Sequence, residues 1–300
     1  MVRSNQAIYV FCDSHEPGPL TIIKGVRRFP NLFVTFQNEY QFSVYIGIST
    51  RTHCTSNHSQ DFPESEITLR KRLSSASSFY DPYGLFRPIT IRAAILIQQL
   101  RTFDWDTPLP EEVHEQWSTL QNDLQQAVTH EVFRFIADMD DKNNQFELHI
   151  FCDASMQAYS CAVYLRAINK SADISTTQLI FAKSRIVKPQ LYTIPKMELF
   201  AAVLASRTIQ FIRKVLPINY GSQILWCDRE CVLSWIKSTK ILPLFVQRCI
   251  DEIRNLPELS FRYVSSADNP ADLPTRGVNY EKLRTSIWFT GPSWINSPHQ

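Results

Sequence analysis

Polar and apolar residues alternate in some stretches of this chain and follow a helical period in others. Near the N-terminus, residues 33–36 and 40–46 alternate and are joined by the polar residues 37–39, which predicts two strands connected by a turn. Residues 47–66 are rich in Ser, Thr, Asn and His, a composition that is typical of a loop.

Residues 67–127 have helical spacing and are predicted to form a small helical module. Its first helix ends before a turn at 80–84, and its second covers residues 89–100. The third covers about 111–126 and begins with two acids, which suit the positive end of the helix dipole. The polar residues 128–146 predict a linker or a hairpin.

Strands and helices alternate from residue 147 onward. This order predicts an α/β fold in which a sheet carries helices on both faces. The predicted strands are residues 147–153, 158–165, 179–184, 223–228 and 260–264, and the predicted helices are residues 196–216, 231–237 and 244–255.

Four acidic residues stand at the ends of these elements or among apolar neighbours. Asp153 and Asp228 each follow an apolar run, so each carboxylate is expected where a buried strand ends. Both also have a plain structural interpretation, as a turn cap and as a helix N-cap. Glu198 lies in an otherwise apolar helical stretch, where an unpaired carboxylate is costly unless positive charge meets it. Asp272 is likewise set among small and apolar residues.

Clustered carboxylates suit the hydrolysis of phosphodiesters. Hard cations such as Mg²⁺ prefer oxygen ligands and are usually held by one or two carboxylates each. Two such ions about 4 Å apart stabilise the attacking and leaving oxygens of the reaction together. Three or four acids at strand and helix ends supply the ligands that such a site needs.

The charge distribution agrees with a site for a polyanion. Of the 300 residues, 44% are hydrophobic, which is enough for a core, and the net charge is +2. Residues 1–147 carry 13 Lys/Arg and 18 Asp/Glu, a balance of −5, whereas residues 148–300 carry 18 and 11, a balance of +7. A basic half with clustered acids suits nucleic acid and a metal, although chance drift also produces such a bias.

Cysteine usage and hydropathy bear on the cellular compartment. The seven cysteines form no CxxC pair, which favours a reducing, intracellular environment over a disulfide framework. His53, Cys54 and His58 lack a second pair of ligands and make a poor zinc site. The N-terminus lacks the apolar core of a signal peptide, and the best apolar run, 197–212, is interrupted by Arg207, so no membrane partner is expected.

Six separated motifs occur along the chain, at residues 80–93, 151–155, 182–185, 193–199, 268–277 and 288–294. In this order they resemble the Pol protein of BEL/Pao-type LTR retrotransposons and, more broadly, the ribonuclease H fold of retroelement polyproteins. The resemblance covers about residues 67–295, and its first part, 67–127, is usually described as the Pao retrotransposon peptidase region.

The resemblance implies a domain order. A β-rich remnant of the reverse transcriptase C-terminal part (1–66) would be followed by a helical connection module (67–127). A ribonuclease H-like α/β domain with a mixed sheet (147–280) and a C-terminal tail (281–300) would come next. The implied partners are an RNA–DNA hybrid and a reverse transcriptase or integrase portion of the same polyprotein, in a cytoplasmic particle or the nucleus.

The resemblance also implies a ribonuclease H with named site residues. The catalytic and metal-binding acids would be Asp153, Glu198, Asp228 and Asp272, which would hold two ions of Mg²⁺ or Mn²⁺. Five basic residues near these elements are candidate phosphate contacts. The alternative interpretation of each is an ordinary charge on the solvated surface. They are Lys183, Arg185, Lys188, Lys196 and Arg276.

Two departures and two alternatives accompany this hypothesis. The chain has no Tyr-x-Asp-Asp motif, so DNA synthesis is not expected, and the loop 264–268 lacks the histidine that many ribonucleases H place there. One alternative is a truncated, inactive remnant that binds nucleic acid without cutting it. The other is an aspartic peptidase, which needs two Asp-Thr/Ser-Gly loops. The nearest matches, at Asp106 and Asp13, lack the glycine.

Overall fold

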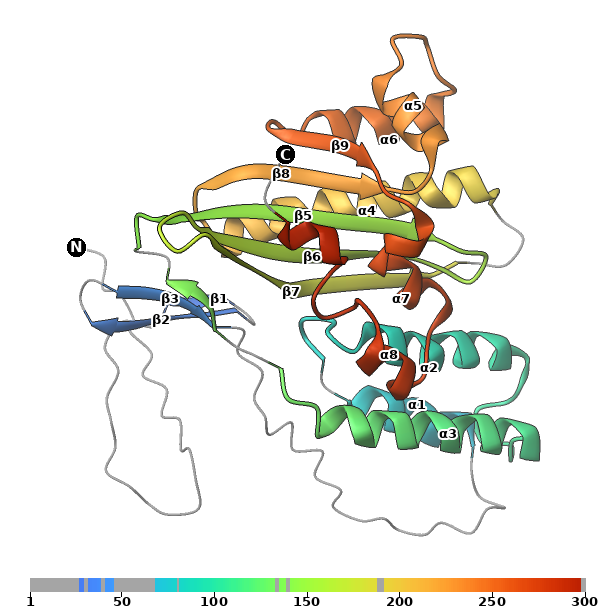
Figure 1. Ribbon diagram of the computed structural model, residues 1–300. Helices are drawn as coiled ribbons and strands as arrows, with labels where there is room; N and C mark the ends of the chain where they lie inside the picture. Colours follow the sequence, from blue (N-terminus) through green and yellow to red (C-terminus); the bar gives the residue numbers. More distant parts are fainter. Residues whose placement is uncertain are drawn as a thin grey trace, which may run out of the picture.

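The computed structural model describes residues 27–29, 32–38, 41–45, 68–79, 81–132, 135–138, 141–187 and 192–297. An antiparallel sheet near the N-terminus has the strand order β1-β2-β3-β4 (Figure 1). It confirms the two predicted strands and adds two others, of which β4 lies in the segment predicted as a linker or hairpin. The strands are β1 (Arg27–Phe29), β2 (Leu32–Asn38), β3 (Gln41–Tyr45) and β4 (Phe135–Asp138).

Three helices follow, as the spacing predicts: α1 (Leu69–Ser78), α2 (Arg87–Gln99) and α3 (Glu111–Val128). Thr68 caps α1 by accepting a hydrogen bond from the backbone of Lys71. Pro88 stands in the first turn of α2, where a missing N–H costs nothing. Trp117 of α3 is completely buried.

The main sheet has five strands in the order β7-β6-β5-β8-β9. Strands β5, β6 and β7 are antiparallel neighbours, whereas β8 runs parallel to β5 and β9 parallel to β8. The predicted mixed α/β sheet is therefore confirmed. The strands are β5 (Asn144–Ala154), β6 (Ala158–Asn169), β7 (Ile174–Ile186), β8 (Tyr220–Cys227) and β9 (Leu259–Tyr263).

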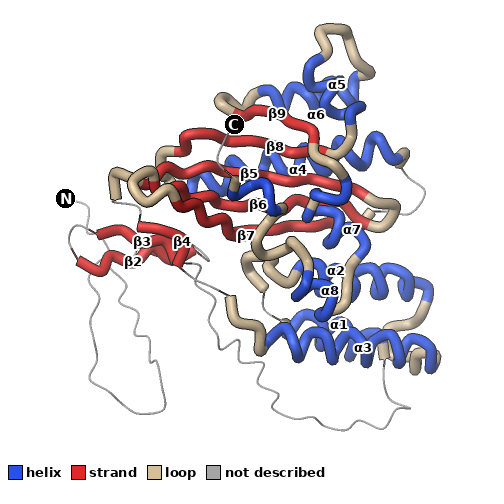
Figure 2. The backbone as a smooth tube through the Cα atoms, viewed as in Figure 1, coloured by secondary structure: helices blue, strands red, loops and turns tan. Residues whose placement is uncertain are grey.

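Helical segments cover both faces of this sheet (Figure 2). Helix α4 (Ile194–Val215) packs on β5 and β6, and α6 (Leu244–Arg254) and α5 (Glu230–Lys237) pack beside it. A short 3-10 helix, Ser293–Asn296, lies over the opposite face. Among the described residues, no helix combines the length and the apolar character that crossing a membrane requires.

The loop before α2 fixes the helical module to the edge strand β7. The carboxylate of Asp81 accepts backbone hydrogen bonds from the residues four and five positions later, at 2.8 and 3.0 Å. Gly84 has a φ of 71°, and a Cβ there would lie 2.0 Å from the carbonyl oxygen of Ala182, so only glycine fits. Arg87 donates to the side-chain and backbone oxygens of Ser184, at 2.9 and 3.1 Å.

Residues 286–297, here called the C-terminal strap, follow helix α8 (Tyr280–Thr285) and are packed into the fold. Trp288 is completely buried and donates through its indole N–H to the carbonyl oxygen of Leu85 at 2.6 Å. Its own carbonyl accepts from the Tyr164 hydroxyl at 2.6 Å. In the described part of the predicted C-terminal tail (281–300), large aromatic side chains therefore pack into the fold.

Candidate metal centre

The sheet topology brings two of the predicted acids to one edge. Strands β5 and β8 are parallel, and Cys152 is the register partner of Cys227. The next residue on each strand is an aspartate, so Asp153 and Asp228 emerge at the same level where the two strands end. Only 3% of Asp153 and 9% of Asp228 is exposed.

Glu198 completes a compact group of three acids. Helix α4 begins after Thr193, and its first turn contains Pro195. Glu198 lies on the buried side of this helix and is 0% exposed. One carboxylate oxygen from each of Asp153, Glu198 and Asp228 lies within 4.8 Å of the other two. These three residues are called the acid group below.

The acid group has the donor set of a divalent-cation site. Glu198 Oε2 and Asp228 Oδ1 are buried and have no hydrogen-bond partner among the described residues. Buried carboxylate oxygens without partners are costly, because their hydration is lost without replacement. Three clustered carboxylates are hard oxygen ligands of the kind that Mg²⁺ and similar ions prefer. The residues therefore fit a divalent metal.

Burial and mutual repulsion both disfavour the charged forms of Asp153 and Glu198. Burial, followed by the nearby charges of Asp228, Glu198 and Asp272, raises the pKa of Asp153 to about 8. Burial and Asp228 raise the pKa of Glu198 to about 7, against the lowering effect of Arg229. Asp153 and Glu198 therefore hold protons at a higher pH than free carboxyl groups do.

Asp272 stands beside the acid group but outside it. It ends the 3-10 helix Pro270–Asp272, its side chain is 40% exposed, and it forms an ion pair with Arg276 at 3.0 Å. Thr275 connects it to the group, since its hydroxyl lies 3.3 Å from Asp153 Oδ2 and 2.7 Å from the Asp272 carbonyl oxygen. The structure thus brings three predicted acids together and places the fourth at the edge.

Besides Thr275, two further polar residues that the sequence did not single out contact the acid group directly. Ser266 donates through its hydroxyl to Asp228 Oδ2 at 2.7 Å. Arg229 donates through Nε to Glu198 Oε1 at 3.1 Å and lies 4.0 Å from Asp228 Oδ1. The position of Arg229 directly after Asp228 is the only sequence signal for its role, whereas nothing local marks Ser266.

The predicted basic contacts are spread around this edge. Arg185 is exposed near the end of β7, and Lys183 lies half-buried on the same strand. Lys196 is exposed in the first turn of α4, with its ammonium 5.9 Å from the ring centre of Phe245. Lys188 lies outside the described residues.

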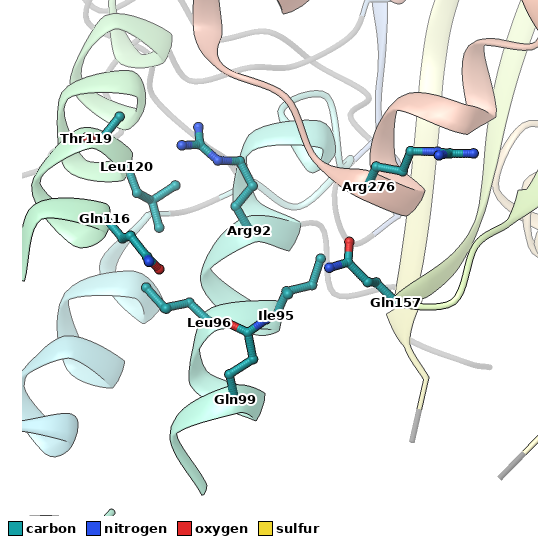
Figure 3. Close-up of a pocket in the computed structure, with 9 residues that line it drawn as sticks. All are labelled: Arg92, Ile95, Leu96, Gln99, Gln116, Thr119, Leu120, Gln157 and Arg276. Atoms are coloured by element: carbon teal, nitrogen blue, oxygen red, sulfur yellow. The ribbon is translucent and has the colours of Figure 1, made fainter. Parts of the chain in front are cut away.

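A cleft of about 290 Å³ lies between helices α2 and α3 and the β5–β6 turn (Figure 3). Arg276 lines this cleft and also forms the ion pair with Asp272. Arg92 points toward α3, where it forms an ion pair with Asp123. The other lining residues are Ile95, Leu96, Gln99, Gln116, Thr119, Leu120 and Gln157.

Residues 68–229 match the model of one protein family, the Pao retrotransposon-like RNaseH-like domain. No curated protein matches the chain in sequence.

Solved structures of two RNases H1 and of a viral protease-reverse transcriptase show distant similarity to part of the chain. LC11-RNase H1 in complex with an RNA/DNA hybrid is 12% identical, with 43% of this chain and 91% of that chain covered and a TM-score of 0.30. RNase H1 from the halophilic archaeon Halobacterium salinarum NRC-1 is 11% identical, with 42% and 90% covered and a TM-score of 0.28. The foamy viral protease-reverse transcriptase in complex with dsDNA is 14% identical, with 65% and 38% covered and a TM-score of 0.26.

Proposed function

We propose that this chain, which belongs to the family of Pao retrotransposon-like RNaseH-like domains, hydrolyses the RNA strand of an RNA–DNA hybrid. One observation carries the proposal. Three acids from β5, α4 and the end of β8 lie within 4.8 Å of one another. Two of their buried oxygens have no hydrogen-bond partner among the described residues, so the group is suited to cations.

In this proposal Asp153, Glu198 and Asp228 hold two divalent ions, Mg²⁺ or Mn²⁺, and Asp272 completes the second site. Bound ions of this kind supply charge stabilisation for the attacking and leaving oxygens and a nucleophilic water at neutral pH. The protein holds the carboxylates in place through Thr275 and Ser266, which donate to Asp153 and Asp228. The Asp272 side chain is 40% exposed, so in this proposal it would be accessible to substrate.

A hybrid duplex would be recognised by its shape, its 2′-hydroxyls and its phosphates, not by its base sequence. Basic residues around this end of the sheet suit phosphates, and their contacts would weaken with salt. We assign this role to Lys183, Arg185, Lys196 and Arg276, and the same assignment for Lys188 stays a prediction. It also stays a prediction that residues 1–66 derive from a reverse transcriptase. The same holds for a partnership with a polymerase or an integrase.

The test is cleavage of a hybrid whose RNA strand is labelled, in buffer with Mg²⁺. The chain is expected to cut this RNA and to leave the same RNA intact in single-stranded form. Asp153→Asn should abolish cutting, whereas Asp104→Asn, a neutralisation of an exposed acid in the loop before α3, should not. Binding of the hybrid without cutting by the unmodified chain would contradict the proposal and support an inactive, nucleic-acid-binding remnant.

A further inference from the structure

One positive side chain reaches into the acid group from within the chain. Arg229 follows Asp228 directly, at the position where helix α5 begins. Its Nε donates to Glu198 Oε1 at 3.1 Å and lies 4.0 Å from Asp228 Oδ1. The Glu198 side chain is completely buried, whereas 47% of the Arg229 side chain is exposed. Arg229 therefore approaches a buried carboxylate from the solvent side.

This contact engages one of the two carboxylate oxygens of Glu198. A carboxylate binds a metal ion through its oxygen lone pairs, and an N–H donor on the same oxygen competes for them. Oε1 accepts from Arg229, whereas Oε2 is buried and has no hydrogen-bond partner among the described residues. The two oxygens of Glu198 thus have different roles, one paired with a guanidinium and the other open.

We propose that Arg229 is the resident counter-ion of the acid group and lowers its affinity for divalent metal. Without metal, the guanidinium neutralises part of the charge that the three buried carboxylates share. When an ion binds Glu198, Arg229 gives up its bond to Oε1 and turns toward solvent, which its exposure permits. Arg229 is a positioning residue in this scheme, and it has this role only if the acid group binds metal as proposed above.

The physical reason is competition between like charges. A guanidinium stays protonated at all relevant pH values, so it cannot leave the site by losing its charge. A divalent ion at the same carboxylates is repelled by it and also has to replace its hydrogen bond. One unit charge at ion-pair distance in a water-exposed setting changes the affinity for a divalent ion roughly tenfold.

The experiment measures Mn²⁺ binding to the full chain by electron paramagnetic resonance, without substrate. Arg229→Ala should bind Mn²⁺ roughly tenfold more tightly than the unmodified chain. Arg229→Lys, which keeps the charge, should stay close to the unmodified chain. The matched control is Arg284→Ala, which removes an equally charged arginine that is paired with Glu281 on α8; its Mn²⁺ affinity should not change.

A second measurement separates this role from a merely structural one. In EDTA, Arg229→Ala should melt at a lower temperature than the unmodified chain, because repulsion in the acid group is no longer offset. Saturating Mn²⁺ should remove this difference. A deficit that persists unchanged in Mn²⁺ would mean that Arg229 only supports the fold, which overturns the proposal.

The outcomes distinguish this proposal from the proposed nuclease. Equal Mn²⁺ affinity in the unmodified chain and Arg229→Ala overturns the counter-ion role and leaves the metal centre intact. No Mn²⁺ binding by either protein overturns both. Tighter binding by Arg229→Ala supports the counter-ion role even if neither protein cuts a hybrid.

Discussion

Asn269 donates a hydrogen bond from its side-chain amide to the carbonyl oxygen of Cys152, at 3.0 Å, and both residues are buried. Cys152 directly precedes Asp153, and Asn269 caps the 3-10 helix that ends at Asp272 by accepting from the N–H of Ala271. One amide group thus ties the loop of the fourth acid to the strand of the first. Together with Thr275, this bond fixes the relative position of Asp153 and Asp272.

Asn269→Ala should therefore destabilise the chain and disturb the acids together. Removing the amide leaves the buried Cys152 carbonyl without its side-chain donor, at a cost of about 1–3 kcal/mol. Urea denaturation measures this loss, and hybrid cleavage should fall at the same time. Asn255→Ala, at an exposed position after α6, should stay within about 0.5 kcal/mol. Equal stability of the two variants would contradict the anchoring role.

The metal-free chain should lose stability as the pH rises toward 8. The folded-state pKa values of Asp153 and Glu198, about 8 and about 7, lie above their usual values of 3.8 and 4.5. Between about pH 4 and pH 8 the folded state therefore binds more protons than the unfolded state. The stabilisation that these protons give is complete below about pH 4 and is lost as the pH rises through the folded-state pKa values. Melting temperatures in EDTA from pH 5 to 9 measure how steeply stability falls with pH, and Mg²⁺ should make this fall less steep. A flat profile in EDTA would show that the acids do not share buried charge.

Asp153→Asn should stabilise the metal-free chain above pH 8. The substitution keeps the size of the side chain and removes one buried negative charge, a gain on the order of 1–3 kcal/mol. At pH 5 the gain should largely vanish, because Asp153 is already protonated in the folded state. Thermal unfolding at both pH values in EDTA provides the check, with Asp104→Asn as the matched control. A variant that is less stable than the unmodified chain at pH 8.5 would contradict a repulsive acid group.

Trp288→Ala should be one of the most damaging single changes. Trp288 is 0% exposed and makes two buried hydrogen bonds, with Leu85 and Tyr164. Loss of its volume should cost about 3–5 kcal/mol. Trp105 is 48% exposed, and its change to Ala should cost much less. Denaturant midpoints compare the two, and similar losses would argue against a structural role for the C-terminal strap.

Arg185→Ala should weaken hybrid binding in a salt-dependent way. A side chain that contacts one phosphate contributes about 0.9 to the slope of log affinity against log salt. Filter binding in EDTA between about 50 and 200 mM salt measures this slope without cleavage. Arg284→Ala, on α8, should leave the slope unchanged. An unchanged slope in Arg185→Ala would place Arg185 outside the substrate path.

The strands of the main sheet and their order in the chain follow from local pattern. Apolar runs end at Asp153 and at Asp228, and the parallel pairing of β5 with β8 then places these acids at one edge. Glu198 was predictable for a different reason, since an acid in an apolar helical stretch needs a compensating partner. The three acids that form the group are therefore the ones with the clearest sequence signal.

Long-range contacts account for what the sequence did not predict. Strand β4 is a short apolar run within a segment that is otherwise rich in polar residues, and it pairs with the distant strand β3. The C-terminal strap mixes residues typical of loops with large aromatic ones, and it is buried through contacts with distant parts of the chain, such as that between Trp288 and Leu85. The contact of Arg229 with Glu198 likewise depends on how α4 packs beside the end of β8, which no local pattern encodes.

The bond between Trp288 and Leu85 also has a consequence for synthesis of the protein on the ribosome. The two residues are 203 positions apart, so the helical module is synthesised long before the C-terminal strap that packs on it. Domains generally fold as units as they are synthesised, N-terminal parts first. We expect nascent chains arrested before residue 286 to be cut by protease in the loop ahead of α2, and chains released after residue 297 to resist it. Equal resistance at both lengths would show that the module is complete on its own.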